Sequence, residues 1–163
     1  SLILQKINDL SSEKRDNNKY SISSLLNKKF IFLQESFSSR IEVIKEIGDM
    51  LNKEGYVTEE FTISALSREK LTSTAVGNGV AIPHGKDTYV NRPIIAVIIL
   101  NEPIDWGGYP VDIIFYLALH FENSKETKNF FKKFHGLVDN QNQLIIIRNT
   151  KNIDVLYQIL IDL

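Results

Sequence analysis

The stretch Ile94-Ile95-Ala96-Val97-Ile98-Ile99-Leu100 is a continuous apolar run of the length of one strand, and Val111 to Leu119 has much the same character. Such runs predict strands that are buried on both faces of a sheet. Pro103 to Pro110 is rich in turn-forming residues and is expected to connect the two strands. Within it, we interpret Trp106 as a cover over the core. The two runs therefore place a buried sheet at the centre of the fold.

A helix is predicted upstream of this sheet. Ser39 and Glu42 form a capping box at its start, and Gly55 stands where its end needs a positive φ. Its expected apolar face consists of Ile41, Ile44, Ile47, Met50 and Leu51. A second helix is predicted to begin at Thr58, which two acidic residues follow, and to run to about Lys70.

Shorter signals surround these elements. Phe30 to Leu33 predicts a short strand, and a helical turn is expected over Ile22, Leu25 and Leu26. Helical stripes over Glu126 to Asp139 and Ile153 to Leu163 predict two further helices. Leu144 to Ile147 fits a strand by propensity and a short buried helix by length. Helices before and between strands predict an α/β domain.

Composition limits the class of protein. The 163 residues carry a formal net charge of -1 and no cysteine. This charge gives no global field for nucleic acid or an anionic membrane, and the lack of cysteine excludes disulfides, a zinc ribbon and a thiol nucleophile. Since the apolar runs are too short to span a bilayer, we expect a cytoplasmic protein without membrane insertion or direct nucleic acid binding.

The first residues differ from the rest. Leu2, Ile3, Ile7 and Leu10 have helical spacing, whereas Ser11 to Lys19 is polar and without apolar periodicity. We therefore expect residues 1–19 to be a helix and linker from an upstream region. With 43% hydrophobic residues in the chain, residues 20–163 suffice for one domain with its own core.

His84 is the first candidate for chemistry. The polar, glycine-bearing segment Leu71 to Gly79 predicts a loop, Val80 to Ile82 a strand, and Pro83-His84-Gly85 an exposed turn. Proline stiffens one side of the histidine and glycine leaves the other side open. Imidazole has an ordinary pKa near 6.5, so at neutral pH it is mostly an unprotonated nucleophile, suited to reversible phosphoryl transfer.

Two neighbouring features suit the same chemistry. Backbone N–H groups of Gly77-Asn78-Gly79 are expected to form an anion nest for the transferred group. Arg68, near the end of the preceding helix, is expected to supply a guanidinium. Lys86, beside the turn, is either a docking residue for an acidic partner or a solvated lysine.

The run Gly77-Asn78-Gly79-Val80-Ala81-Ile82-Pro83-His84-Gly85 resembles the active-site signature of the fructose/mannitol-type IIA domains of the bacterial phosphoenolpyruvate-dependent sugar phosphotransferase system. Arg68-Glu69, Ser73-Thr74 and Pro103-Ile104-Asp105-Trp106-Gly107 also resemble family positions. The resemblance covers roughly residues 21–163 and implies a mixed sheet with helices on both faces.

The resemblance also implies roles. His84 would be phosphorylated by phospho-HPr, Arg68 would stand beside the phosphorylated histidine, and Asn78 would belong to its supporting loop. Transport members usually carry a second histidine where this chain has Ser124 to Lys128. His120 could take its place, or could be a local hydrogen-bonding residue.

Other histidine roles are not expected. His135, among aromatic residues on a predicted helix, is interpreted as a tucked structural residue. No two of the three histidines have helical metal-ligand spacing, so neither a metal nor a cofactor is expected.

Three functions remain open at this point. The domain is either the regulatory C-terminal part of a PRD-type transcription regulator or antiterminator, or a transport IIA component that passes phosphate to a IIB cysteine. The absence of the second histidine and the upstream segment favour the regulator. A third alternative is an anion-binding module without a covalent step, in which His84 only donates or accepts a hydrogen bond.

Overall fold

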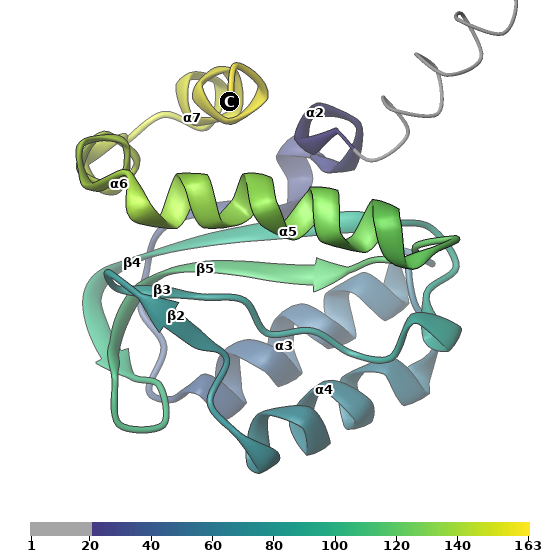
Figure 1. The fold of residues 1–163 in the computed structure, drawn as a ribbon. Coiled ribbons are helices and arrows are strands. Elements are labelled where there is room, and N and C mark those ends of the chain that lie inside the picture. The colour runs from purple at the N-terminus through teal and green to yellow at the C-terminus, as the bar shows by residue number, and fades with distance from the viewer. Residues whose placement is uncertain (1–20) are drawn as a thin grey trace, which may run out of the picture.

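A mixed sheet of five strands, in the order β1-β4-β5-β3-β2, forms the middle layer of the protein (Figure 1). The computed structural model describes residues 21–163, so the predicted helix and linker of residues 1–19 lie outside the described residues. The strands are β1 (Ile31–Glu35), β2 (Ala75–Gly77), β3 (Val80–Ala81), β4 (Ile94–Asp105) and β5 (Pro110–Ala118). β1 pairs with β4 and β3 with β5 in parallel, whereas β4 with β5 and β2 with β3 are antiparallel.

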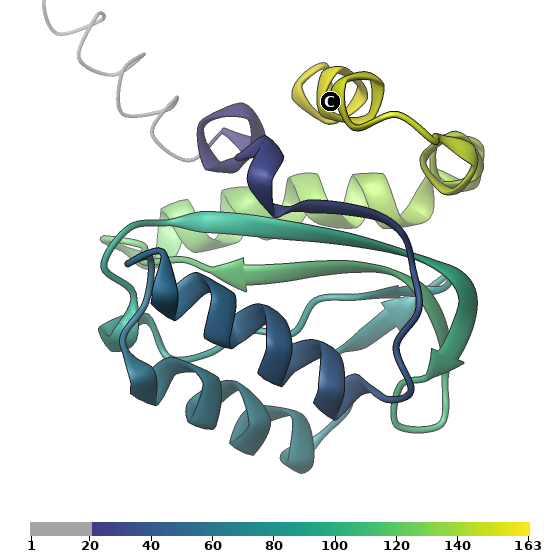
Figure 2. The same cartoon turned by 180° about the vertical axis from the view of Figure 1, so that it is seen from behind.

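Helices cover both faces of the sheet, as the sequence predicts (Figures 1 and 2). The helices α3 (Arg40–Lys53) and α4 (Glu59–Leu71) lie on one face. On the opposite side lie α5 (Ser124–Asp139), α2 (Ile22–Leu25), α6 (Gln141–Asn149) and α7 (Ile153–Ile161). Two short 3-10 helices span Lys28–Phe30 and Asp87–Tyr89. Among the described residues, no helix has both the length and the apolar character that a membrane crossing requires.

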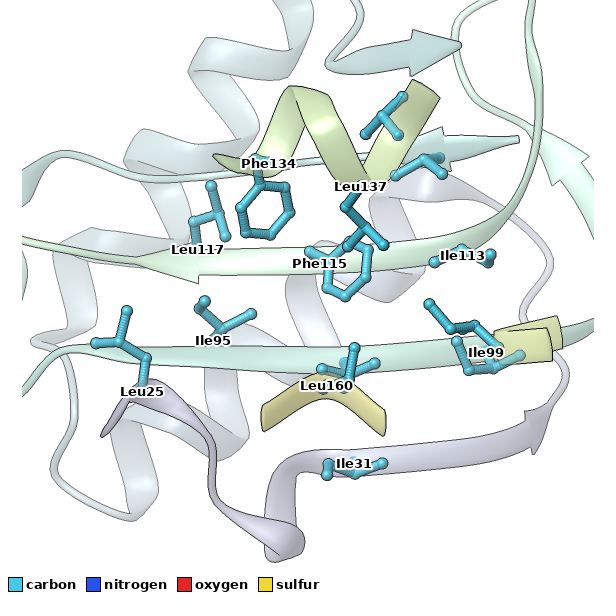
Figure 3. Close-up of a cluster of buried hydrophobic side chains, with 14 of the residues drawn as sticks. Leu25, Ile31, Ile95, Ile99, Ile113, Phe115, Leu117, Phe134, Leu137 and Leu160 are labelled. Atoms are coloured by element: carbon cyan, nitrogen blue, oxygen red, sulfur yellow. The ribbon is translucent and has the colours of Figure 1, made fainter. Parts of the chain in front are cut away.

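Alternation along β4 divides the core into two halves. Ile95, Val97 and Ile99 pack with the α5 side, where Figure 3 shows Ile95 and Ile99 near Phe115 and Leu160. The intervening Ile94, Ala96, Ile98 and Leu100 pack with α3 and α4. Successive side chains of a strand point to opposite faces, so an apolar run without polar breaks fits only a strand covered on both sides.

The connection from β4 to β5 is shorter than predicted. β4 continues to Asp105, with a register shift against β5 between Ile99 and Ile104, and only Trp106 to Tyr109 form the turn. The Trp106 N–H donates to the Tyr109 carbonyl at 2.7 Å. Trp106 itself is fully buried in the core, as predicted.

The start of α3 confirms one half of the capping box. Ser39 Oγ accepts a hydrogen bond from the Glu42 N–H at 3.2 Å. The Glu42 carboxylate, however, accepts from the Ser38 N–H at 2.8 Å rather than from Ser39. Hydrogen bonds from the Ser38 side chain and backbone hold the pKa of Glu42 below its ordinary value. At the other end, Gly55 has the predicted positive φ, 83°.

The predicted apolar face of α3 needs a correction. Ile44, Ile47 and Leu51 are buried, but Ile41 is 52% and Met50 41% exposed. Val43 is buried in their place, because the two helices α3 and α4 pack side by side and shift the buried stripe.

The ambiguous segment Leu144 to Ile147 belongs to helix α6. Leu144 and Ile147, three residues apart, are fully buried, whereas Ile145 and Ile146 are about half exposed. The spacing of the buried pair is that of one helix face, which periodicity over four residues could not establish.

Candidate functional site

His84 lies where the chain leaves β3 and continues alongside β5. It forms an isolated parallel bridge with Leu117, and the Leu117 N–H donates to the Pro83 carbonyl at 2.9 Å. The sheet therefore holds the backbone on both sides of the histidine, while its side chain remains half-buried.

One nitrogen of the His84 ring is already engaged. Nδ1 lies 3.0 Å from the carbonyl oxygen of Ile82. A carbonyl can only accept, so Nδ1 carries the proton of the neutral ring and Nε2 carries the lone pair. No hydrogen bond from Nε2 to any residue between 21 and 163 is found. The ring is thus oriented as a nucleophile through Nε2.

The turn after His84 is pressed against α4. The Lys86 N–H donates to Ser64 Oγ at 2.9 Å, and that hydroxyl donates to the Phe61 carbonyl at 2.7 Å. A Cβ added at Gly85 would lie 2.6 Å from the Phe61 ring. Glycine at position 85 therefore also permits the close packing of this turn onto α4.

An open cleft of about 660 Å³ lies between this turn and α4. Its lining consists of Glu60, Ile63, Ser64, Ser67, Arg68 and Leu71 from α4, with His84, Gly85, Lys86 and Tyr89 from the turn and the 3-10 helix after it. The α4 residues recur every three or four positions, so they share one helix face. Sequence reasoning identified His84, Arg68 and Lys86 but missed the rest of this face, which its spacing could have shown.

Arg68 is fixed at the end of α4. Its Nη1 donates to the Thr72 carbonyl at 2.8 Å, at the C-cap of the helix. Arg68 also lines the cleft that His84 lines. The structure therefore brings the imidazole of His84 and two basic side chains, Arg68 and Lys86, to one cleft.

Gly77-Asn78-Gly79 lies elsewhere. Gly77 ends β2, and Asn78 and Gly79 form the hairpin turn between β2 and β3, so the predicted loop contains a strand. All three have positive φ: 105°, 53° and 78°. β3 begins beside Ile113 and His84 lies beside Leu117, roughly 13 Å further along β5. The turn does not line the cleft, so the anion nest expected there is not placed at His84.

Contacts with α5, α6 and β5 hold that turn. Asn78 donates to the Val138 carbonyl at 3.0 Å, and Arg148 donates to the carbonyl oxygen of Asn78. Arg148 Nε also donates to both carboxylate oxygens of Asp112, at 2.9 and 2.8 Å. These contacts fix the predicted supporting loop at the edge of the sheet.

The other histidines lie outside the cleft. His120 follows β5, and its Nδ1 is 3.4 Å from the Asp87 carbonyl and 3.9 Å from Asp87 Oδ2. His135 is exposed on α5, so its interpretation as a tucked residue is wrong. Across residues 21–163, no three acidic or histidine side chains converge as a metal site.

The sequence was also compared with known proteins. Residues 24–162 match the family described as "Phosphoenolpyruvate-dependent sugar phosphotransferase system, EIIA 2". The chain belongs to this family.

Two relatives of this EIIA domain are regulators from Bacillus subtilis (strain 168). The transcriptional regulator ManR is 34% identical over 107 residues, which cover 66% of this chain and 16% of ManR. The probable licABCH operon regulator is 34% identical over 143 residues, 86% of this chain and 22% of the regulator. The chain therefore spans less than a quarter of either relative.

Solved structures show the same EIIA fold. One is the complex of enzyme IIAMTL and phosphorylated enzyme IIBMTL from Escherichia coli, with a TM-score of 0.74 and 23% identity. The match covers 85% of this chain and 98% of that one.

Proposed function

We propose that this EIIA domain accepts a phosphoryl group on Nε2 of His84, with phospho-HPr as the donor. The observation that carries the proposal is the hydrogen bond from His84 Nδ1 to the Ile82 carbonyl, which leaves the Nε2 lone pair at a cleft that Arg68 also lines. This arrangement supports attack by the ring without a separate base.

The step balances without a proton transfer at His84. The Nε2 lone pair forms a bond to phosphorus, the bond from phosphorus to the donor breaks, and its electron pair leaves with the donor. Nδ1 keeps its proton, and its bond to the Ile82 carbonyl stabilises the positive charge that develops on the ring. Arg68 and Lys86 offset the negative charge of the phosphoryl oxygens.

The apolar rim of the cleft favours a protein as the phosphoryl donor. Two apolar side chains of α4 at its rim, Ile63 and Leu71, are 66% and 82% exposed. Large exposed apolar residues beside a reactive group are typical of a docking surface for another protein. Phospho-HPr docked on this rim would bring its phosphoryl group to His84.

We further propose that the domain serves as the regulatory C-terminal domain of a sugar-responsive transcription regulator. The observation that favours this is the identity of 34% with two much longer regulators. No histidine stands at the start of α5, and His120 does not line the cleft. This favours a domain that accepts phosphate over one that passes it on to a further protein.

The alternative is a transport IIA component that passes its phosphate to a cysteine of a IIB domain. The family description and the fold shared with a IIA–IIB complex support it. In either role the domain needs no membrane insertion and no direct contact with nucleic acid, because the cleft presents His84 to a partner protein.

Intact mass spectrometry tests the proposal. The protein is incubated with phosphoenolpyruvate, enzyme I and HPr, beside His84→Ala, at a neutral or basic pH that preserves phosphohistidine. We expect one phosphoryl adduct in the wild type and none in His84→Ala, with the fold of the variant retained. No adduct in the wild type would contradict the covalent step and leave an anion-binding module.

Addition of a IIB domain to the phosphorylated protein then separates the two roles. Retention of phosphate on His84 is expected for a regulator, whereas rapid loss to the IIB cysteine would support the transport alternative.

A further inference from the structure

Glu69 is a buried carboxylate beside the proposed site, and the proposed reaction does not use it. Its side chain is only 3% exposed, whereas the preceding Arg68 faces the cleft. Successive residues of a helix point about 100° apart, so Glu69 turns inward where Arg68 turns outward. A buried carboxylate is costly unless hydrogen bonds satisfy it, so its partners show what it holds.

Its partner is Thr74, where the chain enters β2. Glu69 Oε1 accepts from the Thr74 N–H at 3.0 Å, and Oε2 accepts from the Thr74 hydroxyl at 2.6 Å. Arg40 Nη1, from the start of α3, also donates to Oε1 at 3.2 Å. The Thr74 hydroxyl in turn accepts from Trp106 Nε1 at 3.0 Å. Two segments therefore donate to one carboxylate, and a third, at Trp106, joins the network through the Thr74 hydroxyl.

A chain of hydrogen bonds leads from Thr74 to the reactive ring. The Thr74 carbonyl accepts from the Ile82 N–H at 3.1 Å. The Ile82 carbonyl is the group that accepts from His84 Nδ1 at 3.0 Å. The N–H and the carbonyl of Ile82 belong to adjacent peptide units joined at one Cα, so holding the N–H restricts the direction of the carbonyl. The carbonyl that sets the His84 tautomer is thus positioned from Glu69.

The same carboxylate also fixes Arg68. The Thr72 carbonyl, which accepts from Arg68 Nη1 at 2.8 Å, lies two residues before Thr74. Since Glu69 holds both the N–H and the hydroxyl of Thr74, the backbone between the end of α4 and β2 is pinned.

We infer that Glu69 is a positioning residue that sets the geometry of both His84 and Arg68. It holds Thr74, and Thr74 in turn keeps His84 in the Nδ1–H tautomer through the backbone of Ile82. The inference rests on the proposed function, because the two groups it positions are those of the phosphoryl transfer. Glu69 itself touches neither group.

Glu69→Gln tests this role with little change in shape. The amide nitrogen of glutamine cannot accept from the Thr74 hydroxyl, so one link is lost. We expect ¹⁵N spectra of the imidazole, at a pH where it is neutral, to change from the Nδ1–H tautomer to a mixture of tautomers. We also expect the rate of phosphorylation in a single turnover to fall roughly ten- to hundredfold.

A second pair of variants tests the link at Thr74. Thr74→Ser keeps the hydroxyl and is expected to keep the tautomer and the rate. Thr74→Val keeps the shape without the hydroxyl, and we expect it to reproduce the effects of Glu69→Gln. This pair decides the question if Glu69→Gln does not fold.

Asn152→Ala is the control for a general loss of stability. Asn152 caps α7, whose N–H groups at Asp154 and Val155 donate to it, on the face of the sheet opposite α4. Its removal lowers the unfolding midpoint without touching the network, so tautomer and rate should match the wild type.

The outcomes are distinguishable. Suppose that the wild type forms the adduct and that folded Glu69→Gln and Thr74→Val have the tautomer and the rate of the wild type. This result overturns the positioning role alone. Equal slowing in Asn152→Ala also overturns it, because stability would then be the cause. No adduct in the wild type overturns the proposed function and, with it, the inference.

Discussion

Gly85 passes so close to α4 that a Cβ at this position would lie 2.6 Å from the ring of Phe61 and 2.7 Å from Ser64 Oγ. Real Cβ atoms do not approach other atoms so closely, and Gly85 has no positive φ that would require glycine by itself. Its role is therefore to let the turn that carries His84 pack directly onto the helix that carries Arg68.

Gly85→Ala is expected to push this turn away from α4. The added methyl group should lower the free energy of unfolding by about 1–3 kcal/mol, as overpacking does, and should slow phosphorylation of His84. Urea unfolding and the rate of adduct formation measure the two effects. A variant as stable and as fast as the wild type would show that the Phe61 ring can move aside.

Gly136→Ala provides the matched control. Gly136 lies within α5, and a Cβ there would meet nothing within 4 Å. Alanine has the higher helix propensity, so this variant should gain about 0.5–1 kcal/mol of stability and keep its phosphorylation rate.

Asp112→Asn tests the role of the Gly77-Asn78-Gly79 turn. The ion pair that it weakens is partly buried, since the side chain of Arg148 is 29% exposed and that of Asp112 18% exposed. A weaker pair also loosens the contact of Arg148 with the Asn78 carbonyl. We expect a loss of about 1–3 kcal/mol in unfolding free energy, because a charge-assisted and partly buried pair is broken. The phosphorylation rate of the folded variant should stay within about twofold of the wild type. Marked slowing would instead return the turn to the phosphate site.

His120→Gln tests whether a second histidine takes part. His120 is 53% exposed, contacts Asp87 and does not line the cleft of His84. We therefore expect its removal to leave both adduct formation and stability nearly unchanged, within about 0.5 kcal/mol for stability. A large fall in the rate would mean that His120 reaches the phosphoryl group when the donor is bound.

The sequence predicts the sheet well where apolar residues are continuous. Residues 94–100 of β4 and 113–118 of β5 are buried on both faces, so these runs hold no polar residue that would confuse the pattern. β2 and the end of β4 were missed because they are short or exposed: Ala75–Gly77 is three residues long, and Asn101 to Pro103 carries exposed side chains. Whether such segments form strands depends on pairing with neighbouring strands, and this pairing is a property of the whole fold.

In the candidate site, too, the local motifs could be predicted from the sequence, whereas the long-range geometry could not. His84 and Arg68 stand in motifs that local chemistry makes visible, and the structure brings both to one cleft. The distance between His84 and the Gly77 turn depends on the register of β3 against β5, which no local pattern contains. The partners of Glu69 come from two other segments, at Arg40 and Thr74, and Trp106 reaches Thr74 from a third, so this network could not be predicted either.

Arg68→Ala tests the guanidinium group that lines the same cleft as His84. If the guanidinium stabilises the transferring phosphoryl oxygens, its removal should slow phosphorylation on the order of 10²-fold, the typical effect of one lost oxyanion donor. Arg68→Lys keeps the charge but not the planar fork, so we expect an intermediate rate. Lys70→Ala removes the same charge from the same helix at an exposed position that does not line the cleft, and it should leave the rate unchanged. Equal slowing in Arg68→Ala and Lys70→Ala would mean that net charge guides the donor, whereas an unchanged rate in Arg68→Ala would remove this residue from the site.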